Sequence, residues 1–173
     1  MRISILGPLE VRSAAGPVHV GGSRVRALLV LLALEAGRPV TGERLIDALW
    51  ADDPPANAAN ALQTLVKRLR ATLRPNLRVD GVPGGYLLPI EPEAVDAREF
   101  TALAARRDAD SLERALALWR GPALADLRAV PRLAAVATAL DDERLVALEA
   151  YAQAVLALPA EPGRTAGLAA TSA

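Results

Sequence analysis

The spacing of hydrophobic residues changes twice within the first 90 positions of the chain. At the start they come in short bursts, broken at Gly7-Pro8 and Gly16-Pro17, which predicts two or three short antiparallel strands. From Ser23 the spacing becomes helical, and this core helix is expected to have Ser23 as its N-cap and to stop at Gly37. A second helix is expected to begin at Thr41.

A third helix is predicted from about Pro55 to Leu73, after a connector that contains two prolines. Its apolar residues form one stripe. At about 100° per residue, the opposite side is centred on Asn60, Thr64, Lys67 and Ala71. No acidic residue occurs from position 54 to 79. The segments 77–79 and 86–90 are expected to be strands joined by a glycine-rich turn, so a hairpin follows the basic helix directly.

Helical spacing returns after Pro92. Three helices are expected, over 95–107, 111–119 and from 132 or later to about 158. The acids and hydroxyl predicted to cap them, or to lie in their first turns, are Asp96, Asp110 or Ser111, and Asp141. Residues 159–173 have few large apolar side chains and are expected to form a flexible tail. The sequence thus predicts three parts, 1–91, 92–158 and 159–173.

Charge is distributed unevenly, although the formal net charge is +0. Residues 1–90 hold 11 Lys and Arg against 7 Asp and Glu, and residues 91–173 hold 9 against 13. A basic first half suits binding to a polyanionic partner, whereas an acidic second half suits a helical region that does not contact this partner. There is no Cys and His19 is the single His, so no cysteine-based zinc site and no cofactor is predicted. No secretory signal and no apolar run of about 20 residues is present, which favours a cytoplasmic protein.

Three helices followed by a hairpin are what a winged helix-turn-helix requires, and its third helix enters the major groove of double-stranded DNA. Asn and Gln can pair with adenine, and Lys and Arg with guanine or phosphate. A polar face with several basic residues is more often only a solvated face. The combination of an acid-free basic helix, a tight connector before it and a hairpin behind it favours DNA binding.

Several motifs also carry a family resemblance. In chain order they are residues 5–11 (ILGPLEV), 24–29, 44–50 with 53–55, 60–63, 68–70 and 85–88. This set closely resembles the Streptomyces antibiotic regulatory protein family of actinobacterial activators. The resemblance implies an α+β fold: an OmpR-type winged helix with a small N-terminal β-sheet and a C-terminal β-hairpin wing, followed by an all-α segment.

Residues 96–100 and 115–127 resemble the start of that family's bacterial transcriptional activation domain, a longer array of tetratricopeptide-like helix pairs. This chain holds about one and a half such pairs. Because stacked repeats need neighbours to bury their faces, the shortened region is expected to pack on the winged helix or on a second copy.

The resemblance implies a regulator, and more specifically an activator, of biosynthetic or secondary-metabolite genes. Such a protein binds direct repeats near a promoter, as a homodimer or as tandem copies, and contacts RNA polymerase. The candidates for reading bases are Asn57, Asn60, Gln63, Thr64, Lys67 and Arg68. The candidates for contacting phosphate are Arg24, Arg26, Arg70 and Arg74. The turn over 80–84 has no basic residue, so no minor-groove contact by the wing is expected. These motifs give no support for control of the protein's activity by phosphorylation or by nucleotide binding.

Two other features could suggest different roles. Trp50, Tyr86 and Trp119 could stack on bases, but their apolar positions favour core packing. The acidic pair at 52–53 and the acidic triplet at 141–143 could suggest catalytic carboxylates, but both are expected at helix starts, so no enzyme is predicted. The alternative function is a helical interaction protein that pairs with a full-length homologous regulator and modulates it.

Overall fold

The computed structural model of the chain describes residues 1–157, and the tail predicted at 159–173 lies outside the described residues. It contains two small antiparallel sheets. The first has the order β1-β2-β3, with β1 Arg2–Ser4, β2 Glu10–Ser13 and β3 Gly16–Pro17. The second has the order β4-β6-β5, with β4 Val40–Thr41, β5 Asp80–Val82 and β6 Gly85–Leu87. The described part is therefore α+β, as the sequence predicts.

The first three helices are α1 (Ser23–Leu34), α2 (Gly42–Trp50) and α3 (Ala58–Leu73). Most of α1 is buried, which makes it the centre of the winged helix. The predicted cap at Ser23 is wrong, because Gly22 is the N-cap, with a φ of 80°, and no side chain caps this end. Thr41 does cap α2, since its hydroxyl oxygen accepts a hydrogen bond from the Arg44 N–H.

The wing differs from the prediction at its first strand. β5 begins at Asp80 rather than at Leu77, and β6 pairs with β4, a strand of two residues that the sequence did not indicate. Close approach of β4 and β6 requires glycine at 85, because an added Cβ would lie 2.1 Å from the Val40 carbonyl oxygen. The hairpin is thus held to the body of the domain through Gly85.

The second half consists of the 3₁₀ turn η1 (Pro92–Ala94) and three helices, α4 (Asp96–Ala104), α5 (Ala109–Leu116) and α6 (Pro131–Ala157). Asp110 lies in the first turn of α5, as one form of the prediction has it, but neither Asp110 nor Ser111 is the cap. Asp108 caps α5, and its carboxylate accepts a 2.8 Å hydrogen bond from the Ser111 N–H, which lowers the pKa of Asp108.

Asp141 does not cap a helix either, because α6 begins ten residues earlier, at Pro131. It lies within α6 and accepts a 3.0 Å hydrogen bond from the Ala123 N–H, and it also forms an ion pair with Arg128. Burial raises the pKa of Asp141, but these two partners outweigh it, so the pKa is lowered overall. Asp141 therefore anchors the loop between α5 and α6.

Asp96 connects the two halves of the chain. It is the first residue of α4 and is almost completely buried. Its carboxylate accepts hydrogen bonds from the Ile5 N–H at 2.7 Å and the Leu6 N–H at 3.2 Å, and Arg120 lies 3.8 Å away. Burial raises the pKa of Asp96, against the opposing effect of these partners.

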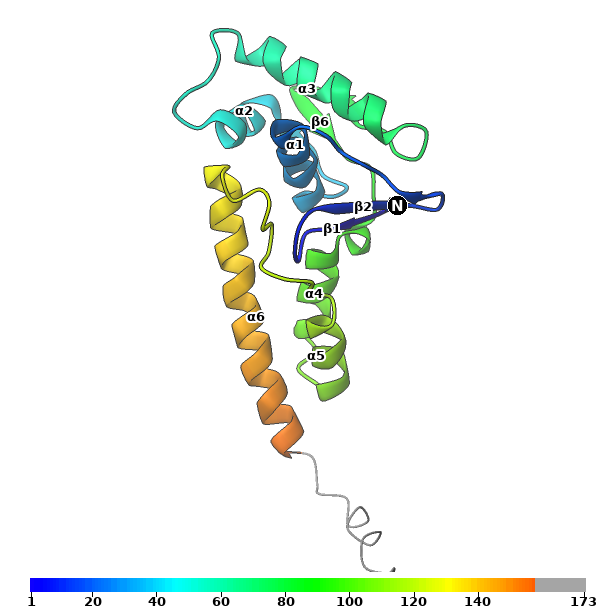
Figure 1. The fold of residues 1–173 in the computed structure, drawn as a ribbon, viewed down its shortest axis with the longest axis vertical. Helices are drawn as coiled ribbons and strands as arrows, with labels where there is room; N and C mark the ends of the chain where they lie inside the picture. The colour runs from blue at the N-terminus through cyan, green and yellow to red at the C-terminus, as the bar shows by residue number, and fades with distance from the viewer. Residues whose placement is uncertain (158–173) are drawn as a thin grey trace, which may run out of the picture.

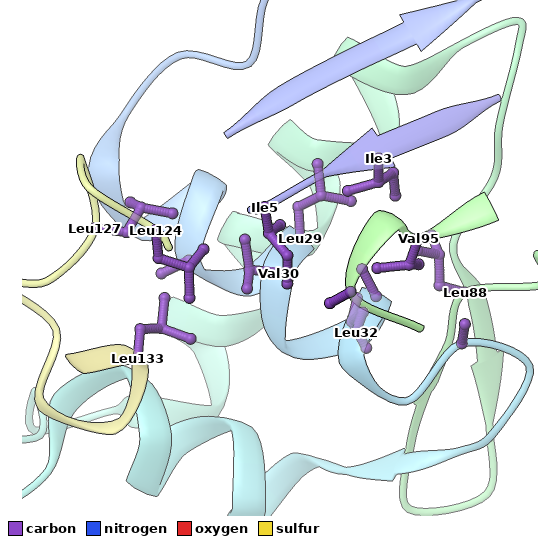
Figure 2. Close-up of a cluster of buried hydrophobic side chains, with 14 of the residues drawn as sticks. Ile3, Ile5, Leu29, Val30, Leu32, Leu88, Val95, Leu124, Leu127 and Leu133 are labelled. Atoms are coloured by element: carbon purple, nitrogen blue, oxygen red, sulfur yellow. The ribbon is translucent and has the colours of Figure 1, made fainter. Parts of the chain in front are cut away.

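One hydrophobic core runs through both halves (Figure 2). Leu124, Leu127 and Leu133 lie beside Ile5 and the side chains of α1 in this core. Backbone hydrogen bonds join the same segments, from the Leu124 N–H to the Ile5 carbonyl at 3.0 Å and from the Arg120 N–H to the Leu6 carbonyl at 2.8 Å. The helical region therefore packs on the winged helix. Among residues 1–157, no helix is both long and apolar enough to cross a membrane.

Candidate nucleic-acid interface

Helix α3 lies along one edge of the molecule, at the end opposite to α4, α5 and the last turns of α6 (Figure 1). Its apolar stripe packs on α1 and α2. The stripe consists of the buried residues Leu62, Leu65, Val66, Leu69 and Leu73. Because these five positions share one side of the helix, the opposite side is left to solvent.

The start of α3 is fixed by Asn57, whose side-chain oxygen accepts a 3.0 Å hydrogen bond from the Asn60 N–H. The helix therefore begins three residues later than the expected start near Pro55. The reason is that Asn57 is an N-cap, a position with non-helical backbone angles. Its amide NH₂ group makes no hydrogen bond within residues 1–157.

All six candidates for reading bases are exposed, on α3 or at its N-cap. The hydroxyl of Thr64 donates to the Asn60 carbonyl at 3.0 Å, a bond within the helix. The side chains of Asn60, Gln63, Lys67 and Arg68 make no hydrogen bond or ion pair in the described part of the chain. The arrangement thus presents amide and cationic groups side by side on one helix face.

The four candidates for contacting phosphate fall into two groups. Arg24, at the start of α1, and Arg74, at the end of α3, are exposed. The guanidinium of Arg24 lies 5.8 Å from the centre of the Trp50 ring. By contrast, Arg26 forms an ion pair with Asp126 in the loop before α6, and Arg70 donates to the Val79 carbonyl at 2.8 Å. Arg26 and Arg70 are therefore engaged within the protein.

Arg78 is an exposed basic residue between α3 and β5 that the candidate set left out. Its guanidinium lies 3.0 Å from the Asp80 carboxylate, which offsets part of its charge. The sequence did offer a sign of Arg78, because it lies within the run from 54 to 79 that contains no acidic residue. The tip of the wing, Pro83-Gly84, carries no charged side chain.

The aromatic residues support the fold. Trp119 is 9% exposed and meets Phe100 edge to face, with ring centres 5.4 Å apart, while Arg144 lies 4.9 Å from the Trp119 ring. Trp50 and Tyr86 are partly buried against the core. Core packing is thus the role that the structure gives these rings.

Two family models match the chain in succession. Residues 19–88 match "Transcriptional regulatory protein, C terminal", and residues 93–171 match "Bacterial transcriptional activator domain". The first match covers α1, α2, α3 and the wing, and the second begins within η1. Both describe transcriptional regulators and not enzymes.

Individual proteins similar to this chain are also transcriptional regulators. The transcriptional regulator RedD of Streptomyces coelicolor is 37% identical over 86% of this chain and 47% of its own length. The regulatory protein DnrI of Streptomyces peucetius is 34% identical over 97% of this chain and 68% of its own length. A solved structure of Mycobacterium tuberculosis EmbR in complex with a low affinity phosphopeptide matches with a TM-score of 0.78 and 32% identity, over 90% of this chain and 45% of that one.

The chain thus spans about half the length of RedD and EmbR and about two thirds of DnrI. The order of the two matched models and the near-complete alignment with DnrI agree with the winged helix and the helices described above. The chain belongs to the Streptomyces antibiotic regulatory protein family of transcriptional regulators.

Proposed function

We propose that this chain binds double-stranded DNA with α3 in the major groove and activates biosynthetic genes from direct repeats near their promoters. The observation that carries the proposal is the outward face of α3, which is exposed, polar and basic along its length. Carboxylates next to phosphates would repel them, and none occurs from position 54 to 79.

In this proposal, the exposed side chains of α3 contact the bases. The amides of Asn60 and Gln63 match adenine, and Lys67 and Arg68 match guanine. Thr64 and the free NH₂ of Asn57 lie on the same face, at the middle and the start of the helix. Arg24 and Arg74 remain as phosphate contacts, since both are exposed and neither forms an ion pair within residues 1–157.

In the same proposal, the helical region activates transcription. We assign residues 1–91 to DNA binding and residues 92–158 to contact with RNA polymerase, with two copies on a direct repeat. Asp96 and the loop before α6 bond to the backbone of residues 5 and 6, so the two parts form one rigid unit. DNA bound to α3 therefore fixes the orientation in which the helical region meets the polymerase.

A binding titration tests the first step. The chain selects duplexes from a random library, and fluorescence anisotropy then measures its affinity for a selected duplex and for a scrambled one at several salt concentrations. If several phosphates are contacted, log affinity falls linearly with log salt, with a slope of about 0.9 per contact. No binding to either duplex at low salt would refute the proposal.

Two variants test the assignment of α3. Lys67→Ala and Asn60→Ala are each expected to weaken binding to the selected duplex by about 1 to 3 kcal/mol, with a smaller loss on the scrambled one. The control matched to Lys67→Ala is Arg106→Ala, which also removes one exposed positive charge but lies in the turn between α4 and α5. Equal losses on both duplexes would assign Lys67 and Asn60 to phosphate instead of bases.

The second candidate function is pairing with a full-length homologous regulator. Helix α6 favours it, because this helix carries the exposed large apolar residues Leu145, Val146, Leu148, Val155 and Leu156. Size-exclusion chromatography with light scattering, on the chain mixed with a full-length member of the family, tests this candidate. A mixed complex that Leu145→Glu abolishes would support it, and separate elution of the two proteins would contradict it.

A further inference from the structure

Arg70 differs from the other basic residues of α3 in where its side chain lies. It is partly buried, and its Nε donates a 2.8 Å hydrogen bond to the Val79 carbonyl, just before β5. Its guanidinium carbon lies 6.0 Å from the centre of the Tyr86 ring in β6. A Cβ added at Gly81 would lie 3.7 Å from its Nη2. One side chain of α3 thus contacts both strands of the wing.

The wing needs such support because its own contacts are few. β5 and β6 are three residues each, and β6 pairs with β4 at two positions, Val40 with Tyr86 and Thr41 with Gly85. A two-stranded hairpin of this size is marginally stable by itself. A guanidinium that donates to one strand and packs on a ring of the other restrains both at once.

We propose that Arg70 is a positioning residue that locks the wing to the recognition helix and does not contact phosphate. This inference rests on the proposed DNA-binding function for its consequence but not for its geometry. With Arg70 in place, the angle between α3 and the hairpin is fixed, so α3 meets DNA in one orientation. The exposed cations left at this end of α3 are Arg74 and Arg78, and of the two only Arg78 forms an ion pair, with Asp80, within residues 1–157.

Two conservative substitutions separate the two roles. In Arg70→Gln, the side-chain amide nitrogen occupies the place of the arginine Nε, so the bond to Val79 is kept while the charge is lost. In Arg70→Lys, a methylene group occupies that place, so the charge is kept while this donor is lost. The two roles therefore predict opposite rankings of the variants.

The first measurement is amide hydrogen exchange in the protein without DNA. We expect Arg70→Lys to speed exchange in β5 and β6 by about fivefold, as the loss of one hydrogen bond would, and Arg70→Gln to change it less. Exchange in α4 and α5 should stay unchanged in both, which separates a local effect from general destabilisation. Unchanged exchange of the wing in Arg70→Lys and Arg70→Ala would overturn the proposal.

The second measurement is the salt dependence of binding to the selected duplex. Arg70→Gln is expected to keep the slope of the unmodified chain, whereas Arg74→Ala should lower it by about 0.9, the value for one phosphate contact. A slope lowered by the same amount in Arg70→Gln, and restored in Arg70→Lys, would show Arg70 to be a phosphate contact. If no variant or parent binds DNA, the proposed function fails, while the exchange measurement still decides whether Arg70 holds the wing.

Discussion

Replacing Asp96 with alanine tests whether the two halves of the chain are joined by one buried carboxylate. The substitution leaves the N–H groups of Ile5 and Leu6 without their acceptor, and both residues are fully buried. It also removes the carboxylate that lies 3.8 Å from Arg120, although Arg120 keeps an ion pair with Glu10 at 2.8 Å. The main effect is therefore on the two backbone donors.

The size of the effect follows from the cost of unsatisfied buried donors, about 1 to 3 kcal/mol each. An opposing effect comes from the carboxylate itself, since burial raises the pKa of Asp96 and so disfavours its charged form in the folded protein. Alanine relieves that penalty. We therefore expect Asp96→Ala to lower the free energy of unfolding by about 2 to 4 kcal/mol, a large part of the about 5 to 15 kcal/mol of a typical domain.

Urea denaturation followed by circular dichroism measures this loss. The matched control is Glu99→Ala, which removes a second carboxylate of α4 that also bonds to the first sheet, through a 2.6 Å contact with Arg2. Both partners of that ion pair are partly exposed, so its removal should cost less than about 1 kcal/mol. If Asp96→Ala costs no more than Glu99→Ala, the reasoning about unsatisfied donors is wrong.

Two further substitutions test other contacts. Asp141→Asn should destabilise the chain at pH 7 more than Asp142→Asn, its exposed neighbour. Because the pKa of Asp141 is lowered in the folded state, its contribution to stability is present above the ordinary value of 3.8 and is lost as pH falls through the lowered pKa. In urea titrations the gap between the two variants should therefore narrow as pH falls below 3.8, and a gap independent of pH would contradict this. Gly85→Ala should lower the free energy of unfolding by about 2 kcal/mol or more, since its Cβ would lie 2.1 Å from the Val40 carbonyl oxygen. Gly81→Ala, in the same hairpin, should lower it by less than about 1 kcal/mol. Equal melting temperatures for the two variants would show that β4 and β6 can separate freely.

The helices were predictable because the spacing of apolar residues along the chain indicates which side of each helix is buried. The stripe from Leu62 to Leu73 repeats at the helical period, so the outward face of α3 followed from helix geometry alone. β4 has two residues, too few to show an alternating pattern, and it exists because Gly85 lets β6 approach it. The start of α3 was misplaced because the cap depends on one hydrogen bond, which the Asn57 side-chain oxygen accepts from the Asn60 N–H.

The partners of single charged residues could not be predicted in the same way. Arg26 and Asp126 are 100 positions apart, and nothing near Arg26 in the sequence indicates an acid beside it. Asp141 resembles a helix-start acid when only its neighbours are considered, and it becomes an anchor because the loop at Ala123 folds back onto α6. These side chains take their roles from tertiary contacts, which periodicity does not encode.

The first 18 residues precede both matched family models, yet they connect the regions that those models describe. The backbone of Ile5 and Leu6 bonds to Asp96, Arg120 and Leu124 of the helical region. The Leu9 N–H donates to Asp126 at 3.0 Å, and Asp126 also pairs with Arg26 at the start of α1. Because these bonds lie close together along one short segment, a change in the orientation of the helical region would have to break several of them together. The segment from Ile5 to Leu9 therefore joins the helical region to the winged helix, alongside the direct packing of α6 on α2.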